Sequence, residues 1–188
     1  MKKIMLMALA VLICTAASAQ QKFAHVNFQE LIQLMPETAS ARDQIEAASK
    51  EAQETYQDMV NEFQNKYTQF EQKRATWTPA VLESKQKEVS QIQNSIQEFE
   101  QAFQMDLQTL QNNLMAPIQQ KAQETVNTLA KANGVIYVFD AASLLYFDAS
   151  QSIDLTPEAR KALNIPEDRT LETLQAELQA KAQAAQQQ

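Results

Sequence analysis

The stretch FEQKRATWTPAVLES, residues 70–84, interrupts a long helical pattern and decides the fold of this chain. Thr78 suits the cap of a new helix, and Pro79 suits the first helical position, where its missing N–H is not needed. On each side of the stretch, apolar residues recur at steps of three and four, which indicates a helix with one apolar stripe. The first stripe comprises Ile45, Ala48, Ala52, Tyr56, Met59, Phe63, Tyr67 and Phe70. The second comprises Leu82, Val89, Ile92, Ile96, Phe99, Phe103, Leu107, Leu110, Leu114 and Ile118.

Two stripes of similar length joined by a short turn predict an antiparallel helical hairpin, about 50 to 60 Å long at 1.5 Å per residue. The second stripe has heptad-like, coiled-coil spacing up to Phe103 and slips by one residue at Leu107. Pro117 should bend or weaken its helix near the base. Between Lys22 and Asn133 the chain contains no glycine, so we expect two rigid arms.

The single glycine, Gly134, also limits the chemistry that the chain can perform. Phosphate-binding loops need several glycines for the backbone to approach the anion, so we expect no nucleotide cofactor and no use of ATP. The only histidine, His25, has no second histidine beside it to complete a metal site, and we expect it to be structural. Asp140 and Asp148 are expected in turn and cap roles, since no nucleophile accompanies them. We therefore predict that the protein is not an enzyme.

Short extended patterns flank the hairpin. Lys22 to Phe28 alternates, with Phe23, His25 and Asn27 on one face and Ala24, Val26 and Phe28 on the other. After the helix stop at Asn133 and Gly134, Val135–Phe139 is an unbroken apolar run typical of a buried strand. Leu144–Phe147 is a second strand candidate, Ile153–Leu155 a weaker third, and a short helix follows from Thr156 to Leu163. These strands must meet in space and form a small base.

The first residues have the features of an export signal. Lys2 and Lys3 precede an apolar run, Ile4 to Ala16, and the small residues of 17–19 suit cleavage before Gln20. An uncleaved anchor and a lipoprotein processed at Cys14 are the weaker alternatives. Cleavage would remove the only cysteine and leave 14 basic against 23 acidic residues, a net charge near −9. Such a chain disfavours nucleic acids and anionic lipid as partners.

The expected fold class is mostly α with a small β base (α+β), in which a long antiparallel hairpin projects from short strands. We divide the chain into a signal peptide (1–19), a β-containing base (20–36 and 133–163), a hairpin arm (37–132) and a C-terminal extension (164–188). The tip of the arm is expected near 75–79. The extension should form a short amphipathic helix on Leu171, Leu174 and Leu178, with disorder from Gln183 onward.

The order of these segments resembles one family. The residues that carry the resemblance are Phe23-Ala24-His25-Val26-Asn27, Leu31, Met35-Pro36-Glu37, Ala132-Asn133-Gly134-Val135, Phe139-Asp140-Ala141, Leu144-Leu145-Tyr146 and Ile153-Asp154-Leu155-Thr156. Together with the hairpin between them, they resemble the Skp/OmpH family of periplasmic chaperones. The resemblance implies a homotrimer with a shared strand base, whose three arms hold unfolded outer-membrane proteins without ATP. Family members with basic arms are credited with binding lipopolysaccharide and membranes, which we do not expect of this acidic chain.

Two sets of residues follow from this resemblance. The expected client contacts are Tyr56, Met59, Phe63, Tyr67, Phe70, Trp77, Phe99, Phe103 and Met105. Most of them lie at helical spacing and could instead form the seam of the hairpin, so Met105 and Trp77 are the better candidates. The expected contacts between subunits in the base are Val26, Phe28, Val135, Val138, Phe139, Leu144 and Tyr146.

A structural role is the alternative function. The hairpin could be a spacer or adaptor of the cell envelope that docks through its tip to one dominant partner. Lys73, Arg74, Lys85 and Lys87 make the tip locally basic, although three glutamates offset much of this charge.

Overall fold

The computed structural model describes residues 22–185, so the expected signal peptide and the last three residues lie outside the described residues. The chain falls into two units, Glu37–Ile118 and the residues on both sides of it. Within 22–185 no helix has both the length and the apolar character needed to cross a membrane.

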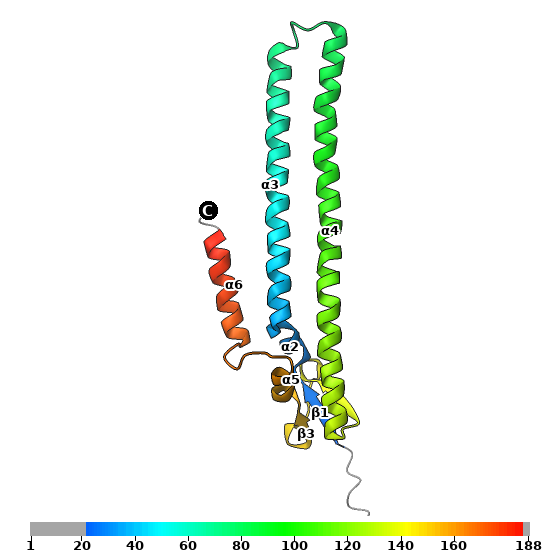
Figure 1. Ribbon diagram of the computed structural model, residues 1–188, viewed down its shortest axis with the longest axis vertical. Coiled ribbons are helices and arrows are strands. Elements are labelled where there is room, and N and C mark those ends of the chain that lie inside the picture. Colours follow the sequence, from blue (N-terminus) through cyan, green and yellow to red (C-terminus); the bar gives the residue numbers. More distant parts are fainter. Residues whose placement is uncertain (1–21, 186–188) are drawn as a thin grey trace, which may run out of the picture. The chain divides into compact units, whose positions relative to one another are not determined.

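The first unit is a helical hairpin. Helix α3 (Pro36–Lys73) and helix α4 (Pro79–Asn133) run side by side in opposite directions (Figure 1). The turn between them forms where the sequence predicts it, because Thr78 Oγ1 accepts a hydrogen bond from the Val81 N–H at 3.5 Å. Pro117 lies inside α4, and the helix continues through it to Asn133. The mostly helical fold class with a small strand region is confirmed.

The only glycine of the chain, Gly134, sets the end of α4. Gly134 has φ +63°, and the N–H groups of Gly134 and Val135 bond back to the carbonyls of Lys131 and Ala130 at 3.2 and 3.1 Å. This pattern is a Schellman motif, in which the left-handed residue ends the helix and satisfies its last carbonyls. Because the Val135 N–H is used there, the expected strand at Val135 begins later, as β2 (Tyr137–Asp140).

The second unit contains a small parallel sheet. Strand β1 (Phe23–Val26) lies between β2 and β3 (Ser152–Asp154), and both neighbours run parallel to it. Helices α2 (Phe28–Leu34) and α5 (Thr156–Ala162) contact each other. The buried core of this unit comprises Ala24, Val26, Leu31, Ile32, Leu34, Met35, Ala122, Val126, Leu155, Ala159, Leu163, Ile165 and Leu174.

The strand expected at Leu144–Phe147 is absent, and the weaker candidate near Ile153 takes its place beside β1. The segment is held instead by two turns of 3-10 helix, η2 (Ala141–Ser143) and η3 (Ala149–Gln151), capped by the side chains of Asp140 and Asp148. Strand propensity alone could not predict this outcome, because whether a segment joins a sheet depends on its tertiary context.

The C-terminal extension forms helix α6 (Leu171–Ala185), which contacts α2. Its Leu174 is buried, and Arg160 holds the segment before it through the carbonyls of Pro166 and Arg169, at 3.1 and 2.6 Å. The same guanidinium donates to Glu30 Oε1 at 3.0 Å. Because α6 continues through Ala185, the disorder expected from Gln183 is wrong for 183–185.

Candidate functional site

The hairpin arm has no dry interior. From Arg42 to Pro117, a range that the structure describes completely, every side chain is either half-buried or exposed. The apolar stripes therefore face each other without being sealed from water. Side chains in such a seam keep surface available for other molecules.

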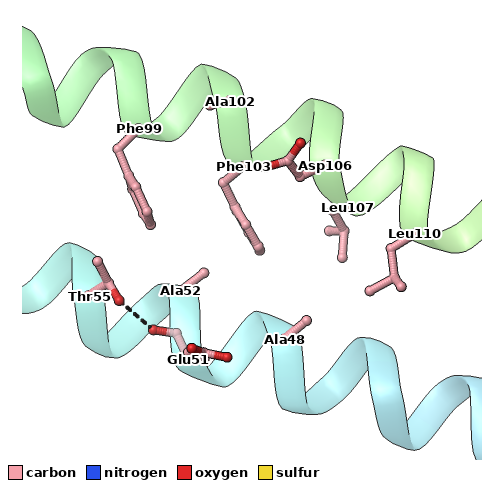
Figure 2. Close-up of a pocket in the computed structure, with 10 residues that line it drawn as sticks. All are labelled: Ala48, Glu51, Ala52, Thr55, Phe99, Ala102, Phe103, Asp106, Leu107 and Leu110. Carbon is pink, nitrogen blue, oxygen red and sulfur yellow. Dashed lines mark hydrogen bonds between the residues drawn. The ribbon is translucent and has the colours of Figure 1, made fainter.

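Small residues on α3 open a groove along this seam. Ala48 and Ala52 lie opposite Phe99, Phe103 and Leu107 of α4, and the space between them amounts to about 360 Å³ (Figure 2). Figure 2 shows the two phenylalanine rings directed from α4 toward the alanines. Because methyl groups cannot fill the space that larger side chains would occupy, the helices leave a mainly apolar hollow.

A second groove, of about 550 Å³, lies on the other side of the same seam. It shares Ala52, Phe99 and Phe103 with the first but is completed by Tyr56 and Glu100. The two phenylalanines can therefore be reached from both sides of the hairpin. We call these two hollows the arm grooves.

Aromatic side chains form ordered pairs along the arm. Phe99 and Phe103 stack with ring centroids 6.3 Å apart, and Phe63 and Tyr67 stack at 5.9 Å. Each pair is spaced by one helical turn on the same helix. At the tip, Trp77 packs on Phe70 with centroids 6.0 Å apart, so the tryptophan helps to close the hairpin.

Polar contacts join α3 to α4 beside this seam. A hydrogen bond to Glu100 raises the pKa of the Tyr56 hydroxyl. Nearer the tip, the Glu88 carboxylate accepts hydrogen bonds from Lys66 and Lys85. These hydrogen bonds lower the pKa of its carboxyl group from the ordinary 4.5 to about 2. The helices are thus linked by partly exposed polar pairs, which individually stabilise a fold only slightly.

The structure separates the expected client contacts into two groups. Met105 and Tyr67 are exposed, at 66% and 47% of their surface. The others are half-buried in the seam: Tyr56, Met59, Phe63, Phe70, Trp77, Phe99 and Phe103.

One face of the parallel sheet is apolar and open. In the register of the sheet Phe23 pairs with Tyr137 and His25 with Phe139, which places these side chains on one face. The rings of Phe23, Tyr137 and Phe139 lie with centroids 6.1 to 6.4 Å apart and remain exposed. Phe147 packs on the His25 end of this face, with ring centroids 4.6 Å apart. Parallel sheets are normally covered on both faces, so the exposure of the remaining rings is unusual. We call this surface the sheet face.

Of the residues expected between subunits, Phe139 and Tyr146 are exposed, and Phe28, Val135, Val138 and Leu144 are half-buried. Val26 is 2% exposed and belongs to the core of its own chain, so it has no surface left for another subunit. Phe23, Ile136, Tyr137 and Leu145, which the sequence prediction did not include, are all exposed. The alternation of 22–28 predicts two faces of β1, and the expected contacts Val26 and Phe28 belong to the face opposite Phe23.

The polar residues of the sheet face have local partners. His25 Nδ1 lies 2.9 Å from Ser152 Oγ, and its Nε2 lies 3.8 Å from Asp154 Oδ1. Asp148 accepts hydrogen bonds from the hydroxyl and the N–H of Ser150, which lower the pKa of its carboxyl group. Across 22–185, no three His, Cys, Asp or Glu side chains are grouped as a metal ion would need.

The structure thus combines a grooved helical hairpin with a small parallel sheet that exposes apolar rings on one face. The family model described as outer membrane protein (OmpH-like) matches residues 22–163, and the chain belongs to this family. The match ends before α6, so the C-terminal extension lies outside it.

Known proteins agree with this assignment. The chain is 26% identical over 155 residues to the chaperone protein Skp of Pectobacterium atrosepticum, covering 81% of this chain and 93% of that protein. It is also 26% identical over 146 residues to Skp of Yersinia enterocolitica, covering 77% and 89%. A solved structure described as an OmpH-like outer membrane chaperone of Caulobacter crescentus shares the fold, with a TM-score of 0.67 at 12% identity over 81% of this chain and 92% of that one. The family is one of chaperones, which confirms the prediction that the protein is not an enzyme.

Proposed function

We propose that this protein is an ATP-independent periplasmic holdase, which binds unfolded outer-membrane protein precursors between the arms of a homotrimer and prevents their aggregation. The observation that carries the proposal is the arm seam, which remains half-buried and grooved from Arg42 to Pro117. A holdase needs apolar surface that is available to many sequences, and a seam without a dry core supplies it.

The chemistry of the arm suits clients of variable shape. Phenylalanine, tyrosine and methionine make broad contacts that do not require one partner geometry. Each contact is weak, but several arms acting on one unfolded chain raise the effective concentration and give tight overall binding. Release then needs no nucleotide, because each contact can break separately.

The sheet face supports self-association. Phe23, Tyr137 and Phe139 expose their rings where a parallel sheet is normally covered, and a hollow of about 310 Å³ lies beside them. Exposed apolar patches of this kind mark interaction sites. Copies of the same chain would cover the face, and assembly as a trimer follows from the family resemblance.

The spacer alternative has less support. Docking through the tip would need an apolar surface there, but Trp77 is half-buried against Phe70. Val81, 40% exposed, is the large apolar side chain that remains open near the turn. One valine is a small anchor for a dominant partner.

The proposal is tested by diluting a urea-unfolded outer-membrane β-barrel protein into buffer without nucleotide and following its aggregation by light scattering. We expect this protein to suppress the scattering and an equal mass of an unrelated helical protein to leave it unchanged. Undiminished aggregation in the presence of the folded protein would refute the holdase function.

A further inference from the structure

The charge of the arm varies along its length. The facing segments 43–65 of α3 and 89–118 of α4 together carry nine carboxylates and one basic residue, Lys50. The tip, 66–88, carries five basic and three acidic residues. The section that contains the arm grooves therefore has a net charge of −8, whereas the tip has a net charge of +2.

Carboxylates also line the grooves themselves. Glu51 on α3 and Asp106 on α4 line the first groove, where both are exposed (Figure 2). Glu100 lines the second groove beside Phe99. The residues that line either groove include no lysine or arginine. Apolar surface and negative charge thus occur together at the same place.

From this combination we propose that the arm grooves select unfolded segments in which large apolar side chains alternate with lysine or arginine. The inference rests on the proposed holdase function and specifies its substrate class. The apolar side chains enter the grooves beside Phe99 and Phe103, while the basic side chains meet the carboxylates at the rim. An acidic segment with the same apolar residues would be repelled, since like charges disfavour association.

The spacing of the aromatic rings suits an extended segment. An extended chain places side chains of one side about 6.6 Å apart, twice its rise per residue. The ring centroids of Phe99 and Phe103 are 6.3 Å apart. Two successive same-side residues of an extended segment can therefore contact the two rings in turn, while the residues between them point away toward solvent and the rim.

The charge also acts before contact. At physiological ionic strength, fields of exposed charges extend about 8 Å, so carboxylates on neighbouring turns of both helices act together on an approaching chain. Electrostatic attraction of this kind mainly raises the rate of association and excludes unsuitable partners. The preference should therefore be strong at low ionic strength and fade as salt is added.

The test uses one unfolded β-barrel protein in two chemical forms. Dimethylation of its lysines keeps their positive charge, and succinylation reverses it, while the sequence remains the same. Fluorescence anisotropy gives the Kd of each form without nucleotide, at low and at high ionic strength. We expect the dimethylated form to bind about tenfold more tightly at low ionic strength. The ratio of the Kd of the succinylated form to that of the dimethylated form should approach one in high salt.

Variants assign the preference to the grooves. Glu51→Lys combined with Asp106→Lys should reduce the ratio of the two Kd values several-fold. The matched control, Glu167→Lys with Glu172→Lys, makes the same change in net charge in the C-terminal extension and should leave the ratio unchanged. Glu51→Gln with Asp106→Asn gives a milder second variant, and circular dichroism verifies that each variant keeps its helices.

The possible failures are distinct. Equal affinity for both client forms would overturn the charge preference and leave the holdase function standing. A control variant that reduces the ratio as much as the groove variant would show that total charge, and not the grooves, is responsible, which also overturns the inference. If neither form is bound, the proposed function fails, and the inference fails with it.

Discussion

Replacing an exposed apolar residue of the arm should affect client binding alone, whereas replacing a half-buried one should also affect the stability of the hairpin. Met105 is 66% exposed and lies outside the apolar stripe of α4, so it contributes little to the hairpin itself. Phe99 and Phe103 lie in the seam, where they serve both the hairpin and the grooves. A variant at Met105 therefore separates client binding from arm stability.

We predict that Met105→Ser weakens client binding about two- to fivefold, which is the effect of losing one partly buried apolar contact. The thermal unfolding temperature and the helix signal should not change. Gln101→Ser, at an exposed polar position one turn earlier in α4, is the control and should bind as the parent does. Unaltered binding by Met105→Ser would show that this side chain is only solvated.

The Glu88 carboxyl group should make the arm sensitive to acid. Hydrogen bonds from Lys66 and Lys85 lower its folded pKa from the ordinary 4.5 to about 2. A lowered folded pKa stabilises the fold above the unfolded pKa, and this contribution is lost as the pH falls through the folded value. The contribution is small because the side chains are partly exposed.

We predict that Glu88→Gln lowers the unfolding temperature slightly above pH 4.5, and that the difference from the parent disappears as the pH falls toward about 2. Thermal melts of both proteins across this range measure the difference. A gap between the two melting curves that stays constant at every pH would contradict the ion-pair explanation.

Some elements could be predicted because their signals are local. The turn of the hairpin was predictable because Thr78 and Pro79 act within one helical turn, and the end of α4 was predictable from Gly134. The prediction of a strand at Leu144–Phe147 was wrong because pairing with β1 depends on residues that are distant in the sequence. The open face of β1 was missed for the same reason, since alternation shows that two faces exist and does not show which one is covered.

The element boundary at Gly134 gives a direct test. A Cβ at this position would meet no atom within 4 Å, so the effect of alanine there comes from the backbone and not from a clash. We predict that Gly134→Ala destabilises the protein by about 1 kcal/mol, because φ +63° is unfavourable for a residue with a side chain. Urea unfolding at fixed protein concentration measures the change.

Asn164 provides the matched control. It also has a left-handed backbone, with φ 56°, and ends α5 in the same hydrogen-bonding pattern. The free energy of unfolding of Asn164→Gly should lie within about 0.5 kcal/mol of the parent value, since glycine tolerates this conformation. Equal stability of Gly134→Ala and the parent would mean that the helix end does not depend on the left-handed residue.

At the scale of the whole molecule, assembly should depend on the sheet face. We predict that Tyr137→Asp with Phe139→Asp prevents formation of the proposed trimer and leaves monomers without loss of helix, because a charged face cannot be buried against another copy. Light scattering coupled to size exclusion gives the mass. Val81→Asp, which changes an exposed apolar residue of the arm tip, is the control and should keep the mass of the parent protein. A double variant with the parent mass would place the assembly surface elsewhere.

Which arm residues touch a client could not be predicted from the sequence, because seam residues and client contacts share one spacing. Tyr56, Phe63 and Phe99 occupy the positions that a hairpin seam requires, and the same rings remain half-buried and available. The loose packing between α3 and α4 would allow both the seam role and the proposed client contact of these rings. That looseness arises from small residues such as Ala48 and Ala52, which looked like ordinary members of the stripe.

The most direct test of the holdase proposal is the mass of the complex with a client. The mature protein is mixed with a urea-unfolded outer-membrane β-barrel protein, diluted without nucleotide, and analysed by size exclusion with multi-angle light scattering. The proposal predicts a soluble complex whose mass equals three copies of this chain and one client. A folded protein that elutes at its own mass, while the client aggregates, would contradict it.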